Sequence, residues 1–261
     1  MIAKERANEK SNVKKVIAIM SGKGGVGKSS VTSLVATALR ENGNSVGILD
    51  ADITGPSIPK LFGINKKRAV GDGEGIIPVT THTGIKVMSL NLLIDKEDAP
   101  VVWRGPIISS TVKQFFTDVN WGNLDYLLID LPPGTGDVSL TIMQSLPLDG
   151  LIVVSTPQDL VKLIVKKSVN MAKMMNTPIY GIIENMSYFE CKDCGKRINI
   201  FGKSRAQEIS NDMGINVIAN IPIDPSLAEL CDEGKVELYG EINYSFTEEL
   251  SNSLMNAIGG I

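Results

Sequence analysis

Short apolar runs recur along the chain and alternate with longer segments of helical spacing. The runs are rich in β-branched side chains and are continuous rather than alternating with polar residues, which is typical of strands buried on both faces of a parallel sheet. They occupy residues 16–20, 46–49, 126–129, 151–154, 179–183 and 217–219. Helical spacing is found at residues 28–42, 158–175, 203–213 and 226–233. This order predicts an α/β fold with a mostly parallel sheet and helices on both faces.

Two segments lie outside this alternation. Residues 76–80 and 85–90 are β-rich runs on either side of a polar stretch that contains Gly84, and they predict an antiparallel excursion or edge pair. Residues 1–12 are polar and are not spaced to bury a face, so we expect a mobile tail there. Because no repeat or linker interrupts the rest, residues 13–261 are expected to form a single domain.

Composition excludes several classes of protein. The chain has 261 residues, of which 43% are hydrophobic and 21% charged, which fits a globular protein and not a disordered or fibrous one. A net charge of -3 produces no basic field, so neither nucleic acid nor an anionic membrane is expected as a partner. Three cysteines are too few for a disulfide framework, and the polar N-terminus lacks the apolar stretch of a secretory signal. We therefore expect a cytoplasmic protein.

The first apolar run leads into the sequence GKGGVGKS at residues 22–29, a match to the phosphate-binding pattern G-x-x-x-x-G-K-[ST] between a strand and a helix. Glycines let backbone N–H groups converge on phosphate oxygens, and the following helix adds its N-terminal dipole. Lys28 can reach the β- and γ-phosphates of ATP, and the Ser29 hydroxyl can ligate Mg²⁺. The residues expected to hold the nucleotide are Gly22, Lys23, Gly24, Gly25, Val26, Gly27, Lys28, Ser29 and Ser30.

Two of the apolar runs end in aspartate: one leads into Asp50 and Asp52, and another into Asp130. Acids at the carboxyl ends of parallel strands face the ligand crevice of an open α/β sheet. Asp130 fits a Walker B acid that holds Mg²⁺ directly or through water, and Asp52 fits a switch I position that orients the attacking water and touches the metal shell. The Pro-Pro-Gly-Thr-Gly stretch after Asp130 fits a switch II loop with Asp137 at its far end. Asp50 and Asp137 suit turn or helix-capping roles equally well.

Cys191 and Cys194 form a C-x-x-C pair in a charged loop at residues 190–197. Two thiolates at this spacing can share one metal site, and Gly195 lets the backbone aim N–H groups at sulfur. The thiolate form is favoured by nearby cations, namely Lys192, Lys196 and Arg197. By itself the pair is compatible with half a zinc site, a redox dithiol or two incidental thiols.

The number of possible metal ligands in the chain reduces these three alternatives. Structural zinc sites and iron–sulfur clusters commonly take four protein ligands. Apart from the pair, the sequence offers Cys231, which we expect to be semi-buried on a helix, and a single histidine, His82, which we expect at the surface. A complete site within one chain is therefore not expected, whereas two chains related by a twofold axis would supply four thiolates.

The phosphate loop carries a second lysine, Lys23, directly after its first glycine, and in this it resembles the deviant Walker A motif of the MinD, ParA, ArsA and nitrogenase iron protein group. In that group the additional lysine is understood to reach across a nucleotide-sandwich dimer to the partner's phosphates. The resemblance implies a P-loop NTPase of the deviant Walker A type in which Lys23 acts in trans. Lys23, Lys28 and Asp52 then form the predicted catalytic set.

The chain also resembles the Mrp/ApbC family of iron–sulfur cluster carrier ATPases. The resemblance rests on LDADITGPSIP at 49–59, VVWRGP at 101–106, LLIDLPPGTGD at 127–137, and GIIENMSYF at 181–189 followed by the cysteine pair. It implies that Asn185 contacts adenine and that Cys191 and Cys194 hold a [4Fe-4S] cluster bridging two protomers. Trp103 and Arg104 lie in a family motif for which the residues themselves indicate no role.

The leading hypothesis is an ATP-hydrolysing carrier that holds an iron–sulfur cluster at a homodimer interface and transfers it to apoproteins. One alternative is a MinD- or ParA-like positioning ATPase, which needs a basic amphipathic helix or a basic DNA-binding face. Residues 245–258 have helical apolar spacing but contain no Lys or Arg, so we expect them to pack on their own domain. Another alternative is electron transfer in the manner of the nitrogenase iron protein, but that family places its cluster cysteines singly on separate loops.

Overall fold

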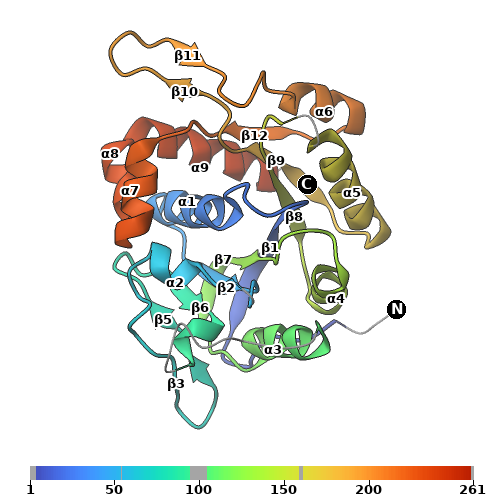
Figure 1. The fold of residues 1–261 in the computed structure, drawn as a ribbon. Coiled ribbons are helices and arrows are strands. Elements are labelled where there is room, and N and C mark those ends of the chain that lie inside the picture. The colour runs from blue at the N-terminus through green and yellow to red at the C-terminus, as the bar shows by residue number, and fades with distance from the viewer. Residues whose placement is uncertain (1–3, 54, 95–104, 159–160, 260–261) are drawn as a thin grey trace.

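The computed structural model describes residues 4–53, 55–94, 105–158 and 161–259. Within these residues an eight-stranded sheet has the order β12-β9-β8-β1-β7-β2-β6-β5. Neighbouring strands pair in parallel except β5 and β6, which are antiparallel. The prediction of a mostly parallel sheet with helices on both faces is confirmed (Figure 1).

Each predicted apolar run lies within one strand of this sheet. The strands are β1 (Asn12–Ser21), β2 (Val46–Asp50), β7 (Asn123–Asp130), β8 (Gly150–Ser155), β9 (Ile179–Glu184) and β12 (Val217–Asn220). In β1, Ile17 and Ile19 pack into the core on one side of the sheet, while Ala18 and Met20 pack into the core on the other. All four side chains are buried. This two-sided burial explains why the runs are continuous rather than alternating.

Helices cover both faces of the sheet (Figure 1). The face of Ile17 is covered by α1 (Lys28–Glu41), α2 (Ile58–Leu61), α7 (Pro225–Glu233), α8 (Tyr239–Ile242) and α9 (Tyr244–Gly259). The face of Ala18 is covered by α3 (Gly105–Thr117), α4 (Asp137–Ser145), α5 (Val161–Met174) and α6 (Ala206–Met213). The segments of predicted helical spacing correspond to α1, α5, α6 and α7. Short 3-10 helices lie at Leu90–Leu92 and Val236–Leu238.

The segment around Gly84 forms the expected edge pair in part. β5 (Val79–Thr80) pairs antiparallel with β6 (Lys86–Met88) at one edge of the sheet. The preceding residues instead form β4 (Ile76–Ile77), which pairs with β3 (Val70–Gly71) in a separate hairpin. A second hairpin, formed by β10 (Phe189–Glu190) and β11 (Arg197–Ile198), projects from the body of the molecule above α7 and β12 in Figure 1.

The segment before β1, which the sequence pattern assigns to a mobile tail, makes specific contacts. The ammonium of Lys4 donates to the carbonyl oxygens of Met143 and Leu146 at 2.7 and 2.9 Å. The backbone N–H of Glu5 donates to the carbonyl of Ser145 at 2.8 Å. These contacts are polar and join distant parts of the sequence, so the local spacing of apolar residues could not predict them.

The C-terminal helix α9 packs on its own domain, as expected. Leu250, Leu254 and Ile258 are buried in the core that also contains α1, and Phe246 packs partly against it. Across the part of the chain that the structure describes, no helix is long and apolar enough to cross a membrane.

Candidate functional site

The phosphate loop connects β1 to α1. It lies at the carboxyl ends of the parallel strands, where β2 and β7 also end. Gly25 and Gly27 adopt positive φ angles of 79° and 77°, a conformation that glycine adopts without strain. Gly27 begins α1 in this left-handed conformation, and no side chain caps the helix. A helix N-terminus that emerges uncapped from a glycine loop is suited to bind an anion.

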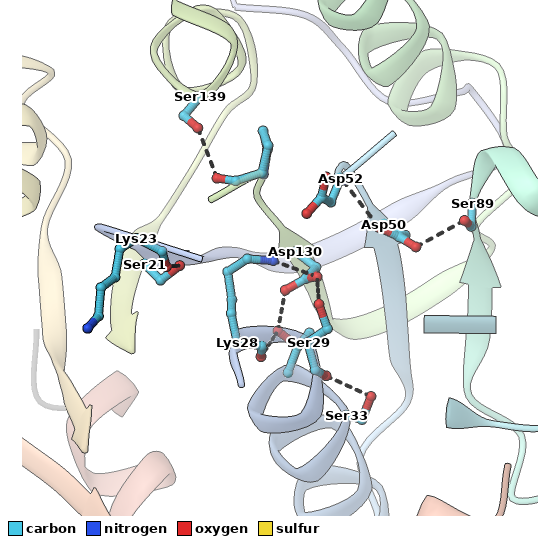
Figure 2. A network of polar contacts seen from close by, with 12 residues as sticks. Ser21, Lys23, Lys28, Ser29, Ser33, Asp50, Asp52, Ser89, Asp130 and Ser139 are labelled. Atoms are coloured by element: carbon cyan, nitrogen blue, oxygen red, sulfur yellow. Dashed lines mark hydrogen bonds and ion pairs between the residues drawn. The ribbon is translucent and has the colours of Figure 1, made fainter. Parts of the chain in front are cut away.

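Lys28, Ser29 and Asp130 converge beneath the loop (Figure 2). Nζ of Lys28 lies 2.7 Å from Oδ2 of Asp130, and the Ser29 hydroxyl donates to the same oxygen at 2.6 Å. The Thr32 hydroxyl lies 2.6 Å from the other oxygen, Oδ1. Lys28 is 6% exposed and Asp130 0% exposed, so each charge depends on the other for compensation. The Lys28 ammonium forms this ion pair without a well-aligned hydrogen bond. Its N–H donors therefore remain available for phosphate oxygens.

Asp50 and Asp52 stand at the end of the neighbouring strand. Asp50 is the register partner of Asp130 across β2 and β7, and it is buried. Burial, reinforced by the charge of Asp130, raises the pKa of Asp50 well above its ordinary value, although Lys28 and a hydrogen bond from Ser89 oppose the shift. The backbone N–H of Asp52 donates to Asp50 at 3.2 Å, and Asp52 itself is partly exposed. Of the two acids, Asp52 is therefore the one that can meet a ligand.

The phosphate loop and Asp52 line one cavity of about 260 Å³. Of the loop residues predicted to hold nucleotide, all except Gly22 line this cavity, together with Ser57 and Pro133. A Cβ added at Gly25 would meet no atom within 4 Å, so the backbone there is open to a ligand. The structure thus brings together the predicted nucleotide loop and the predicted switch I acid.

Lys23 points away from Lys28 and Asp130 (Figure 2). Its ammonium donates to Oε1 of Gln158 at 2.6 Å, in the loop that follows β8, and the contact lies at the surface. Within one chain, Lys23 therefore does not share the position of Lys28 beneath the loop.

The loop after β7 passes beside the phosphate loop. The N–H of Gly134 donates to the carbonyl of Ser21 at 2.8 Å, and the Ser139 hydroxyl on α4 donates to the carbonyl of Pro132 at 3.2 Å. Asp137 lies in the first turn of α4 and is exposed. A carboxylate there interacts favourably with the helix dipole, so Asp137 has the helix-terminal role that the sequence allows.

Asn185 follows β9 and reaches back to the phosphate loop. Its Nδ2 donates to the carbonyl of Val26 at 2.9 Å, and its backbone N–H donates to Ser155 at 2.7 Å. A Cβ added at Gly27 would collide with Nδ2 of Asn185. The structure thus places Asn185 against the backbone of the loop, whereas the family resemblance implies a contact with adenine.

Cys191 and Cys194 lie on the turn of the β10–β11 hairpin. Glu190 and Arg197 are register partners in the hairpin and form an ion pair at 2.8 Å. The turn is closed by a hydrogen bond of 2.8 Å from the N–H of Gly195 to the carbonyl of Cys191, and Gly195 has a φ of 65°. Both cysteines are therefore held on one turn, as their spacing predicts.

The turn favours the thiolate form of Cys191. Hydrogen bonds from the backbone N–H groups of Asp193 and Cys194, and from the Cys194 side chain, lower the pKa of Cys191 below its ordinary value. The cause is therefore the local turn rather than the neighbouring cations. Cys191 is half-buried and Cys194 is exposed. Among the described residues, no group of three or more His, Cys, Asp or Glu side chains could hold a metal ion.

The remaining candidates lie elsewhere. Cys231 is buried on α7, where burial raises its pKa and its side chain contacts that of Ser30. His82 is exposed. Both positions agree with the predictions for these residues. Trp103 and Arg104 lie outside the described residues.

Three polar residues contribute to the site that the sequence analysis does not single out, namely Thr32, Ser89 and Gln158. Thr32 lies three positions after Ser29 on α1, so helical spacing alone places both hydroxyls on one face. Ser89 and Gln158 come from distant segments and carry no sequence signal for these contacts.

The chemistry of these residues fits magnesium and a nucleoside triphosphate. The Ser29 hydroxyl and the carboxylates of Asp52 and Asp130 are oxygen ligands of the kind that Mg²⁺ prefers, and Mg²⁺ usually completes its shell with water and phosphate oxygens. The buried ammonium of Lys28, with donors to spare, and the open backbone at Gly25 suit the phosphates.

Comparisons with known proteins agree with this geometry. The model of the ParA family, described as NUBPL iron-transfer P-loop NTPase, matches residues 12–258. The chain is similar to an iron-sulfur cluster carrier protein of Clostridium perfringens, with 52% identity over 235 residues that cover 87% of this chain and 82% of that protein. It is also similar to an iron-sulfur cluster carrier protein of Methanocaldococcus jannaschii, with 49% identity over 238 residues that cover 90% and 82%.

Solved structures give the same result for the fold. One of them is a nucleotide-binding protein from Archaeoglobus fulgidus, in complex with ADP and described as containing cobalt. It is 47% identical to this chain, with a TM-score of 0.78, and the match covers 87% of this chain and 89% of that one. The cell division ATPase MinD of Pyrococcus furiosus has a TM-score of 0.69 at 19% identity, over 92% and 98%, which shows a shared fold alone. The predicted P-loop NTPase fold of the MinD and ParA type is thus confirmed.

Proposed function

The chain belongs to the ParA family of NUBPL iron-transfer P-loop NTPases, and from this premise we propose that it is an ATP-hydrolysing carrier of iron–sulfur clusters. Two copies would each bind MgATP, hold a [4Fe-4S] cluster between their two cysteine pairs, and pass it to apoproteins. The observation that carries the proposal is the placement of two thiols on one outward turn of a nucleotide-binding fold, where the described residues supply no cluster of three or more metal-ligating side chains.

The nucleotide would be held by the residues that converge beneath the phosphate loop. Lys28 would bind the β- and γ-phosphates, Ser29 and Asp130 would hold Mg²⁺, and Asp52 would orient the attacking water. Magnesium neutralises the phosphate charge as it develops. Binding would exchange the Lys28–Asp130 ion pair for contacts of the ammonium with phosphate and of the carboxylate with the metal shell.

Lys23 would act on the phosphates of the facing protomer. Its ammonium points away from its own phosphate site and reaches the surface beside Gln158. A cation at that place on the loop can approach a nucleotide bound by a second copy and stabilise the charge of the transferred phosphoryl group.

Asn185 would contact adenine through its side-chain amide. Its Nδ2 already donates to the carbonyl of Val26. The side-chain Oδ1 is then the atom that would accept a hydrogen bond from the amino group of the base.

Cluster transfer would be a ligand exchange that needs neither oxidant nor reductant. Each acceptor thiol loses a proton as it binds iron, and each released thiolate of Cys191 or Cys194 takes one up. The lowered pKa of Cys191 favours the thiolate that binds iron, and the exposure of Cys194 lets an acceptor thiol approach the cluster. Coupling to ATP requires that the cluster bind two dimer geometries with different affinity.

Anaerobic reconstitution, with analysis of iron and sulfide, tests this function. Cys191→Ala and Cys194→Ala should each abolish stable cluster binding, whereas Cys231→Ala, a matched control away from the turn, should keep it. The loaded wild-type protein should restore the cluster of an apo-ferredoxin. Undiminished iron and sulfide in both turn variants would refute the assignment.

A further inference from the structure

A hollow of about 570 Å³ lies between the base of the cysteine hairpin, strand β12 and helix α9. All four residues of β12, Val217–Asn220, line it. Because successive side chains of a strand point to opposite faces, a hollow touched by all four must lie along the edge of the strand rather than over one face. Among the described strands β12 pairs with β9 alone, so this edge is open.

An open strand edge presents N–H and C=O groups that can pair with another extended chain. The other walls of the hollow are largely polar and come from the base of the hairpin with its flanking residues, from the segment that leads into α6, from α6 itself and from α9. They include Ser187, Asn199, Ser204, Gln207, Glu249 and Ser253. Such walls can bind the side chains of a segment whose backbone pairs with the strand.

The hollow adjoins the cysteine turn. Tyr188 and Arg197 belong to its wall, and the guanidinium of Arg197 lies 4.4 Å from the centre of the Tyr188 ring. Tyr188 precedes Cys191 by three residues, and Arg197 follows Cys194 by three residues. Three residues of extended chain span roughly 10 Å. A segment docked beside β12 can therefore continue to the thiols.

The charge of the hairpin indicates what kind of segment fits. Residues 190–205 carry five cations and two acids, a net charge of +3, in a chain whose net charge is -3. Lys196 and Lys203 are exposed and form no ion pair with any described residue. An acidic segment of a partner is complementary to this charge.

We propose that this hollow is the docking groove for the cluster acceptor: an acidic, extended segment of the apoprotein adds to the free edge of β12, beside the cysteine turn. The inference rests on the proposed carrier function and adds to it the surface that recognises the recipient.

The groove can be filled without touching the nucleotide site or the cysteines. Ser253→Trp places a bulky side chain in the hollow from α9, and Asn256→Trp, an exposed position on the same helix that does not line it, is the matched control. The probe is an acidic apo-ferredoxin. Its binding to cluster-free carrier and its rate of cluster uptake from loaded carrier are both measured.

Ser253→Trp should weaken apo-ferredoxin binding at least about tenfold and slow uptake in proportion, while cluster content and ATP affinity stay at wild-type values. Asn256→Trp should change none of these quantities. As an independent arm that leaves α9 intact, Lys196→Glu and Lys203→Glu should each weaken binding several-fold, and the exposed control Lys66→Glu should not.

Wild-type affinity in Ser253→Trp overturns the inference, as does failure of the wild-type protein to bind apo-ferredoxin. Dissociation of the carrier's own dimer by Ser253→Trp, with acceptor binding unchanged, also overturns it and makes the hollow an interface between copies. Because binding is measured without cluster, a carrier that binds apo-ferredoxin but never transfers a cluster refutes the proposed function and leaves the groove standing.

Discussion

The ammonium of Lys28 and the carboxylate of Asp130 form a buried ion pair at the base of the phosphate loop, with 2.7 Å between Nζ and Oδ2. Hydroxyl groups of Ser29 and Thr32 satisfy the same carboxylate. The pair forms because β1, which leads into the loop, and β7, which ends at Asp130, are neighbours in the sheet. The fold thus places the lysine of the phosphate loop in direct contact with the acid at the end of β7.

Asp130→Asn should destabilise the nucleotide-free protein by about 3–5 kcal/mol, because the Lys28 ammonium is left buried without its counter-charge. The double variant Lys28→Met/Asp130→Asn removes both charges and should recover part of this loss. Urea denaturation of the purified proteins measures both effects. Equal losses in the single and double variants would show that the ion pair does not govern stability here.

Gly27→Ala should destabilise the protein more than Gly25→Ala. Both positions have positive φ, so each substitution carries a backbone cost of roughly 1–2 kcal/mol. At Gly27 the added Cβ also collides with Asn185, whereas at Gly25 it meets open space. Adding Asn185→Ala to Gly27→Ala should therefore recover stability. Urea denaturation measures the free energies of unfolding of the three variants. Indistinguishable values for Gly25→Ala and Gly27→Ala would show that the collision with Asn185 does not affect stability.

Lys23→Gln should lower kcat for ATP hydrolysis on the order of a hundredfold or more while changing ATP affinity little, because a charge supplied in trans acts mainly on the transition state. Gln158→Ala removes the surface partner of Lys23 and should retain activity.

If Lys23 acts on the nucleotide of the facing protomer, two inactive variants should complement each other when they are mixed. Lys23→Gln and Lys28→Ala should each be inactive alone, but a mixed dimer contains one site with an intact Lys28 and a facing Lys23. Combining the two proteins should therefore restore part of the ATPase activity. No restoration in mixtures shown to exchange subunits would argue that Lys23 acts within its own chain.

Asp224 should make the start of α7 sensitive to acid. Burial raises the pKa of Asp224, but hydrogen bonds from Ser226 and Tyr239 outweigh burial, so the pKa lies below its ordinary value. A lowered carboxyl pKa contributes stability above the pKa of the unfolded chain and loses it as the pH falls through the folded value. Asp224→Asn should therefore be less stable than wild type at pH 7, and the difference should shrink below about pH 4. A pH-independent difference in urea denaturation would contradict this origin.

The sheet and the nucleotide loop were predictable because their signals are local. A strand buried on both faces must be continuously apolar, as at Ile17–Met20, and a loop that wraps phosphate needs glycines, a lysine and a hydroxyl at fixed spacing. Asp50 and Asp130 were predictable as neighbours because acids at the ends of parallel strands meet at one edge.

Other features depend on contacts between distant segments. The hydrogen bond from Asn185 to Val26 and the contact of Lys23 with Gln158 each join separate parts of the chain, so no spacing reveals them. Helix α3 differs, because Ile108, Val112 and Phe115 do repeat at helical spacing and are buried. That helix was missed although the signal was present.

Native mass spectrometry of the anaerobically reconstituted protein measures whether one cluster is shared by two chains. If the proposal of a shared cluster holds, iron and sulfide should appear only on species with the mass of two chains, and both should be lost, together with the cluster-dependent dimer, in Cys191→Ala/Cys194→Ala. A single chain that carries a complete cluster would contradict it.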